Sequence, residues 1–251
     1  MVGMRILITL VVVITASAQT PQTVPASNTP PQAARSGQGP GRGGDTAALE
    51  RYAVENAKVL LPAPGERRVV FMGDSITDSW GRHHGKFFPG EPYINRGIGG
   101  QSTAQMLLRF RQDVIALQPK VVVILGGTND FKASLGVPPE ATRNNIMSMV
   151  DLARANNIQV VLSSLTPVCD YFTPQTNRRP IEKLAELNDW MRNYAARNKV
   201  VYLDYWHAML DDKGVLRKEF TLEGLHPNDA GYAVMEPLAE KAIDAALKQV
   251  R

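Results

Sequence analysis

Between residues 67 and 248 the sequence alternates short apolar runs with longer amphipathic segments, and this alternation is what most limits its possible folds. The apolar runs are typical of buried parallel strands: Arg67–Met72, Tyr93–Asn95, Lys120–Leu125, Gln159–Leu165 and Val200–Leu203. The segments between and after them have helical patterns: Ser102–Leu117, Glu140–Asn156, Ile181–Arg197 and Asn228–Lys248. Each strand–helix–strand step implies a right-handed crossover. The sequence therefore predicts an α/β fold, a three-layer α/β/α sandwich with a mostly parallel, five-stranded, flavodoxin-like sheet.

The first 44 residues differ from the rest of the chain. Arg5, the apolar stretch 6–15 and the A-x-A site at 16–18 predict a signal peptide over residues 1–18. Residues 19–44 contain five prolines, five glycines and no aromatic residue, which predicts a disordered linker. We expect one folded domain over residues 45–251 in an exported protein, periplasmic or extracellular. The alternative is an uncleaved membrane anchor; after cleavage we expect no stable membrane insertion.

Charge and cysteine content exclude several classes of function. The formal net charge is +4, and Lys and Arg are interspersed with Asp and Glu, so we expect no nucleic-acid partner. Cys169 is the only cysteine, which excludes an intramolecular disulfide. His83 and His84 are adjacent, and the chain has neither an HExxH motif nor a Cys/His cluster. We therefore expect no metal and no cofactor.

Small and polar residues follow three of the predicted strands. Gly73-Asp74-Ser75 follows the first strand, residues 96–101 (RGIGGQ) the second, and residues 126–130 (GGTND) the third. Reactive groups gather beyond the carboxyl ends of parallel strands. Acyl transfer to a serine needs a nucleophile, a base and donors aimed at the developing oxyanion. These three stretches contain candidates for the nucleophile and the donors.

Each candidate also has a structural interpretation. Ser75 lies where a strand should turn into a helix, so it could be a nucleophile or a helix N-cap. Gly100 could present its N–H to a substrate or serve as a turn glycine. Asn129 could donate its amide or hold its own loop. His226 could be a base, with Glu223 fixing its tautomer, or a surface histidine.

As a set, these stretches resemble the SGNH (or GDSL) hydrolases over nearly all of residues 67–247. The similar blocks are Val70–Thr77, Asn95–Ser102, Gly126–Asp130 and Glu223–Pro227. The resemblance implies the SGNH hydrolase fold, with Ser75 as nucleophile and His226 as base. It further implies an oxyanion hole made by the N–H groups of Ser75 and Gly100 and the amide of Asn129, with Gly99 as the alternative to Gly100.

One position departs from the family pattern. The family usually has Asp three residues before the histidine, and this chain has Glu223. We expect Glu223 to orient His226, although less well than Asp would. The resemblance is closest to the branch of platelet-activating-factor acetylhydrolase-like and carbohydrate-esterase-like members. It implies a serine esterase that removes short acyl groups, such as acetyl, from a carbohydrate or similar alcohol. The partners expected are thus small-molecule, polysaccharide or lipid esters. The alternatives are a lysophospholipase or thioesterase for longer chains and, from another class, a non-catalytic carbohydrate-binding module.

Three further features could contribute to substrate binding, and two of them also have a structural interpretation. Trp80, Phe87 and Phe88 could line the acyl or leaving-group side or pack in the core. The segment Pro167–Pro180 could form a substrate wall or a solvated connector. Arg96 could bind a polar leaving group.

Overall fold

The computed structural model describes residues 46–132 and 137–249. The predicted signal peptide, residues 1–18, and the predicted linker, residues 19–44, lie outside these ranges. Among the described residues, no helix is both long enough and apolar enough to cross a membrane.

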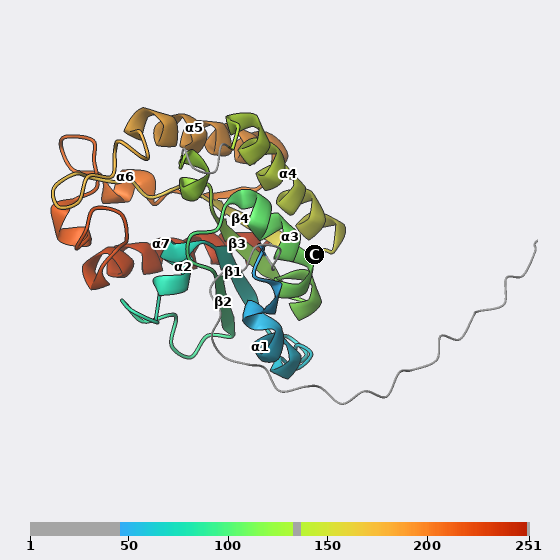
Figure 1. Cartoon of the computed structure of the whole chain (residues 1–251). Coiled ribbons are helices and arrows are strands. Elements are labelled where there is room, and N and C mark those ends of the chain that lie inside the picture. The colour runs from blue at the N-terminus through green and yellow to red at the C-terminus, as the bar shows by residue number, and fades with distance from the viewer. Residues whose placement is uncertain (1–45, 133–136, 250–251) are drawn as a thin grey trace, which may run out of the picture. The chain divides into compact units, whose positions relative to one another are not determined.

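The core of the fold is one five-stranded sheet. Its strands are β1 (Val69–Gly73), β2 (Tyr93–Gly97), β3 (Val121–Leu125), β4 (Gln159–Ser163) and β5 (Val201–Leu203). Their spatial order is β2-β1-β3-β4-β5, and every pairing is parallel (Figure 1). The predicted fold class is confirmed. The pairings among the described strands are all parallel, where the sequence indicated a mostly parallel sheet.

Helices follow the strands as the amphipathic segments predict. They are α1 (Ala53–Lys58), α2 (Ser75–Ser79), α3 (Thr103–Asp113), α4 (Pro139–Ala155), α5 (Ile181–Asn198), α6 (Trp206–Met209) and α7 (Asp229–Leu247). Short 3-10 helices cover Leu49–Tyr52, Ile115–Leu117, Thr128–Phe131 and Lys218–Phe220. The predicted helix 102–117 is shorter than expected: Ser102 caps it in a capping box with Gln105, and it ends at Asp113.

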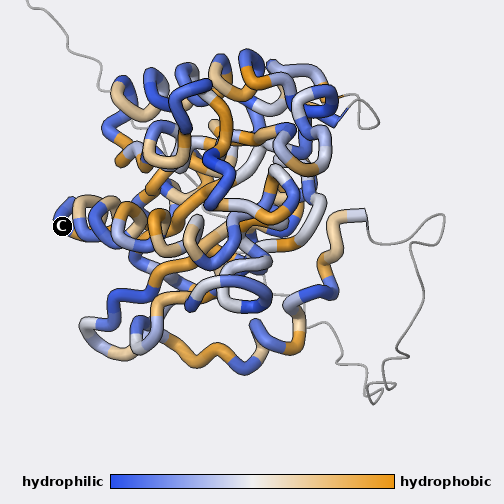
Figure 2. The backbone as a smooth tube through the Cα atoms, turned by 90° about the vertical axis from the view of Figure 1, so that its left-hand side faces the viewer, coloured by the Kyte–Doolittle hydropathy of each residue, from blue (hydrophilic) through white to orange (hydrophobic). Residues whose placement is uncertain are grey.

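Alternate side chains of the strands enter two separate hydrophobic clusters. In β1, Val70 and Met72 pack with α3, α4 and α5, whereas Val69 and Phe71 pack with α2, α6 and α7. Both faces of the sheet are therefore covered, which explains why the strands read as continuous apolar runs. Figure 1 shows α3, α4 and α5 grouped on one side of the sheet. In Figure 2 the hydrophobic colour is concentrated along the strands, and the outer helices alternate between the two colours.

The aromatic residues after β1 belong to the second of these clusters. Trp80 is 2% exposed and Phe88 3% exposed, and both rings lie 5–6 Å from the Phe71 ring. Phe87 also contacts Phe71, edge to face. Of the two readings of these side chains, the structure shows core packing.

The strand register brings three strand ends to one level. Gly73 at the end of β1 is paired with Gly97 of β2 on one side and with Leu125 of β3 on the other. The residues that follow these positions, including Ser75, Gly100 and Asn129, therefore leave the sheet at the same edge.

Candidate active site

Ser75 is the first residue of α2, directly after the turn that ends β1. Asp74 is the N-cap of this helix, and its Oδ1 accepts the Ile76 N–H at 3.0 Å. Ser75 itself is half-buried. Its backbone N–H has no partner within the described residues. Asp74, and not Ser75, is therefore the N-cap of α2. Both the hydroxyl and the N–H of Ser75 remain available for chemistry.

His226 contacts both Ser75 and Glu223 through its two ring nitrogens. Nε2 lies 2.9 Å from Ser75 Oγ, and Nδ1 lies 2.9 Å from Glu223 Oε1. Serine and histidine are 151 positions apart in the sequence. A carboxylate on Nδ1 leaves Nε2 as the acceptor for the hydroxyl proton. The arrangement can therefore activate the serine oxygen as a nucleophile.

The Glu223 carboxylate is held by its own loop. Besides the imidazole, Oε1 accepts the N–H of Leu225 at 3.0 Å and the N–H of His226. Burial raises the pKa of Glu223, but the hydrogen bonds from His226 and the loop outweigh it, so the pKa lies below its usual value. Glu223 is thus held ionised and in contact with the histidine despite its extra methylene.

A second layer of polar side chains supports Glu223 from the segment 167–180. Gln175 donates from Nε2 to Glu223 Oε2 at 3.3 Å, and its Oε1 accepts from Arg179 Nη1 at 3.1 Å. Gln175 is 7% exposed and Arg179 4% exposed. Gln175 and Arg179 are therefore buried rather than parts of a solvated connector, and Gln175 contacts the histidine loop. The interpretation of the segment as a substrate wall stays a prediction.

Gly99 and Gly100 are both candidates for the backbone donor to the oxyanion, and they differ in whether their N–H group already has a partner. The Gly99 N–H donates to Asp78 Oδ2 at 3.2 Å. The Gly100 N–H has no partner within the described residues, and Gly100 has a φ of +80°. A Cβ at Gly100 would meet nothing within 4 Å, so the space beside it is open. The geometry favours Gly100 over Gly99 as a free donor.

Asn129 lies between the Ser75 turn and the glycine loop. It is 2% exposed, and its Nδ2 donates to the Gln101 carbonyl at 3.0 Å and, less closely, to Asp74 Oδ2 at 3.3 Å. Its neighbour Asp130 binds Thr103 and Thr142, which fixes the turn after β3 to α3 and α4. The amide is therefore beside the nucleophile but already engaged.

Arg96 does not face this site. It is 6% exposed, its Nε donates to Asn56 Oδ1 at 2.8 Å, and its guanidinium lies over the Tyr52 ring. The reading of Arg96 as a ligand for a polar leaving group was wrong, because the side chain points toward the segment that precedes β1.

The comparisons with known proteins agree with this geometry. Residues 71–234 match the model of the GDSL-like lipase/acylhydrolase family. The chain belongs to this family. Membership places it among the enzymes that hydrolyse carboxylic esters, as the motifs predicted.

Solved structures of similar length share the fold. A GDSL-like lipase from Bacteroides thetaiotaomicron VPI-5482 is 42% identical, with a TM-score of 0.73 over 80% of this chain and 98% of that chain. A protein from Bacteroides fragilis NCTC 9343, provisionally named an acylhydrolase, is also 42% identical, with a TM-score of 0.76 over 81% and 99%. An acetyl-xylooligosaccharide esterase from Geobacillus stearmophilus, 20% identical with a TM-score of 0.59 over 73% and 96%, is similar in fold alone.

A curated relative matches over a shorter stretch. The uncharacterized lipoprotein YqeF of Bacillus subtilis (strain 168) is 26% identical over 141 residues, which are 48% of this chain and 57% of that protein. The match therefore spans little more than half of that relative.

Sequence reasoning missed the buried polar residues around the site. Gln175 and Arg179 lie in a segment whose length and aromatic residues drew attention, but nothing local marks either as a partner of Glu223. Gln101 lies in the block Asn95–Ser102 without a role of its own. Arg109, a buried residue of α3 that contacts Gln101 and the Gly73 carbonyl, belongs to no motif. The signal that could have found them is an excess of polar residues at positions that a helix or strand pattern assigns to the interior.

The Asp74 carboxyl makes stability depend on pH. Burial raises the pKa of Asp74 from 3.8 to about 6. Between these values the folded chain keeps a proton that the unfolded chain has lost, so the free energy of unfolding falls as pH rises, by up to about 3 kcal/mol. Asp74→Asn removes this dependence. Relative to wild type, its free energy of unfolding in urea should rise by up to about 3 kcal/mol from about pH 4 to about pH 7. An offset that is equal at both pH values would contradict the raised pKa.

The contact between Gln175 and Glu223 can be tested with a double-mutant cycle. Gln175→Glu keeps an acceptor for Arg179 but removes the donor to Glu223, so kcat for nitrophenyl acetate should fall about tenfold with little change in KM. Glu223→Asp should keep the wild-type rate or exceed it, because its carboxylate can still meet the loop N–H groups.

In the Glu223→Asp background the shorter side chain no longer reaches Gln175, which keeps only its 3.4 Å contact to the backbone carbonyl of residue 223. The loss from Gln175→Glu should therefore be at least about fivefold smaller there. Thermal unfolding of all four proteins controls for folding. Equal losses of kcat in both backgrounds would show that Gln175 does not act through Glu223.

Proposed function

We propose that this chain is a serine esterase in which Ser75, His226 and Glu223 form the catalytic triad. The observation that carries the proposal is the pair of 2.9 Å contacts from the two ring nitrogens of His226 to Ser75 Oγ and Glu223 Oε1. Family membership supports an ester hydrolase over a non-catalytic binding module.

The reaction has two steps. His226 Nε2 takes the hydroxyl proton while Ser75 Oγ bonds to the ester carbonyl carbon, and the carbonyl oxygen becomes an oxyanion. The C–O bond to the alcohol then breaks, and the alcohol leaves with the proton from His226. Water attacks the acyl-enzyme by the same route, which releases the acid and restores Ser75. Glu223 stabilises the imidazolium in both steps.

Three donors would hold the oxyanion. The free N–H groups of Ser75 and Gly100 supply two, and both are ready without rearrangement. Asn129 supplies the third. Of its two contacts the one to Asp74 is the longer, at 3.3 Å. We infer that the oxyanion replaces this contact, while the 3.0 Å contact to the Gln101 carbonyl keeps the amide in place.

We infer that the substrate is a short acyl ester, such as an acetyl ester, of a carbohydrate or similar polar alcohol. The space beside Gly100 is open, and Lys132 lies near Asp74, Arg178 and Arg179. Burial lowers the pKa of Lys132, and the nearby charges of Arg179 and Arg178 lower it further, whereas the charge of Asp74 raises it. A flank of ionised groups suits a hydroxylated alcohol better than an aliphatic chain. A lysophospholipase or thioesterase acting on longer acyl chains is the second candidate.

We further propose that the protein is exported, to the periplasm or beyond the cell. The positive residue, apolar stretch and A-x-A site at the start of the sequence support export. A relative that is named a lipoprotein is consistent with it.

Replacing the nucleophile tests the proposed function. Wild-type protein should hydrolyse nitrophenyl acetate, and Ser75→Ala should lower kcat by about three orders of magnitude or more, because no other hydroxyl among the described residues contacts His226 Nε2. A matched control is Ser79→Ala at the other end of α2, which should keep the wild-type rate. Comparable kcat in Ser75→Ala and wild type would overturn the proposal.

A series of nitrophenyl esters tests the acyl specificity. If the enzyme prefers short acyl groups, kcat/KM should fall steeply beyond butyrate, because the acyl side of the site then offers no apolar surface for further methylenes. A value that rises with chain length to octanoate or beyond would favour the lysophospholipase or thioesterase.

A further inference from the structure

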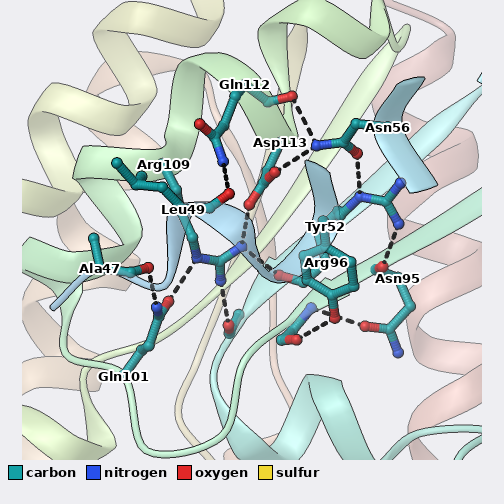
Figure 3. A network of polar contacts seen from close by, with 12 residues as sticks. Ala47, Leu49, Tyr52, Asn56, Asn95, Arg96, Gln101, Arg109, Gln112 and Asp113 are labelled. Atoms are coloured by element: carbon teal, nitrogen blue, oxygen red, sulfur yellow. Dashed lines mark hydrogen bonds and ion pairs between the residues drawn. The ribbon is translucent and has the colours of Figure 1, made fainter. Parts of the chain in front are cut away.

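A buried arginine touches the ends of two strands that lead into the proposed site. Arg109 on α3 is 0% exposed, and Figure 3 shows it within a network of polar contacts. Its Nη2 donates to the Gly73 carbonyl at 2.9 Å, and its Nη1 donates to the Arg96 carbonyl at 2.8 Å and to Asp113 Oδ2 at 3.0 Å. Gly73 precedes the Asp74–Ser75 turn, and Arg96 precedes the glycine loop. One guanidinium thus joins the two segments that carry the nucleophile and an oxyanion donor.

The remaining contact of this guanidinium reaches the far end of the glycine loop. Arg109 Nε donates to Gln101 Oε1 at 2.6 Å. Gln101 is 4% exposed; its Nε2 donates to the Ala47 carbonyl at 2.7 Å, and its own carbonyl accepts from Asn129. Gln101 therefore connects Arg109, Asn129 and the chain before β1. We define the oxyanion loop as residues 97–101; Arg109 contacts Gln101 at its end and the carbonyl of Arg96 directly before its start.

The segment 46–58 holds the same loop from its other side. Tyr52, 1% exposed, donates its hydroxyl to the Gly97 carbonyl. Asn56 donates to Asp113 Oδ1 at 2.7 Å and accepts from Arg96 Nε at 2.8 Å. Figure 3 shows Tyr52 and Asn56 of this segment in one network with Arg109 and Asp113 of α3. The segment before the first strand is thus built into the support of the oxyanion loop.

The loop needs such external support because of its composition. Residues 97, 99 and 100 are glycines, and Gly100 has a positive φ. Glycine has no side chain that packing could hold, and it restricts the backbone less than any other residue. An oxyanion donor, however, must be placed within about 0.5 Å of its working position. Ile98, 8% exposed, is the buried apolar side chain of the loop, and polar contacts to the backbone and to Gln101 hold the positions on either side of it.

We propose that Arg109 and Gln101 are positioning residues that fix the oxyanion loop relative to Ser75. Arginine suits this position because its planar fork donates in several fixed directions at once, which a lysine ammonium cannot reproduce. The proposal rests on the proposed function, since it assigns the Gly100 N–H and the Asn129 amide to the oxyanion.

A pair of glutamine variants tests it. Gln101→Leu removes the contacts to Arg109 and Ala47. The matched control is Gln112→Leu, because Gln112 also lies on α3 and also donates to the segment before β1, at the Leu49 carbonyl, 2.6 Å away, without touching the loop. With nitrophenyl acetate, Gln101→Leu should lower kcat about 10- to 100-fold with KM changed less than about threefold. Gln112→Leu should keep the wild-type kcat.

The pH profile separates positioning from other effects. The acid limb of kcat should stay where it is in Gln101→Leu, because the contacts among Ser75, His226 and Glu223 are untouched. If Gln101→Leu does not fold, Arg109→Lys provides the same comparison, since it keeps a positive charge beside Asp113. Its kcat should fall by a similar factor at unchanged KM, as judged on the folded fraction from thermal unfolding.

Equal kcat per folded enzyme in Gln101→Leu, or in Arg109→Lys where that variant replaces it, and in Gln112→Leu would overturn this inference. That result leaves the proposed function standing if Ser75→Ala is inactive. An active Ser75→Ala protein would overturn the proposed function itself, so the two failures are distinguishable.

Discussion

The parallel register of β2, β1 and β3 is the constraint on which the site depends. Backbone hydrogen bonds pair Gly73 with Gly97 and with Leu125, so three chain segments leave the sheet at one level. Strands whose side chains alternate between two hydrophobic clusters cannot shift by one residue without exchanging their faces. The core therefore fixes the register, and the register determines where Ser75, the oxyanion loop and Asn129 emerge.

Buried polar groups turn this coarse placement into a defined geometry. Arg109 joins the turn before Ser75 to the oxyanion loop, and Gln175 joins the segment 167–180 to Glu223. A buried charge is costly unless it is fully hydrogen-bonded, so such groups tolerate few alternative arrangements. Asp74 shows the same principle at the nucleophile: it caps α2 and contacts Asn129 while burial raises its pKa. The buried members of this set, Arg109 at 0% and Asp74 at 1% exposed, hold the site from the interior of the protein.

Glu223 stands where the family usually has aspartate, and it still contacts the imidazole of His226. Its second carboxylate oxygen contacts the neighbouring segment 167–180. Glu223 Oε1 meets the imidazole and two backbone N–H groups, while Oε2 turns toward Gln175. Gly224 makes the bend possible. It has a φ of +102°, and a Cβ there would lie 2.4 Å from the Cys169 carbonyl. The longer side chain is thus accommodated together with a neighbouring segment that packs closely against it.

The sequence alone determined the fold class, the five strands and the four long helices, because apolar periodicity records burial on each element directly. It also indicated Ser75, His226, Glu223, Gly100 and Asn129 as candidates, since motif residues lie close together along the chain. Only the tertiary structure decided which glycine N–H is free, that Arg96 turns away from the site, and that Arg109, Gln101, Gln175 and Arg179 surround it. These contacts join residues far apart in sequence, such as the 36 positions between Gly73 and Arg109. Such pairings depend on how elements pack together, which no local pattern records.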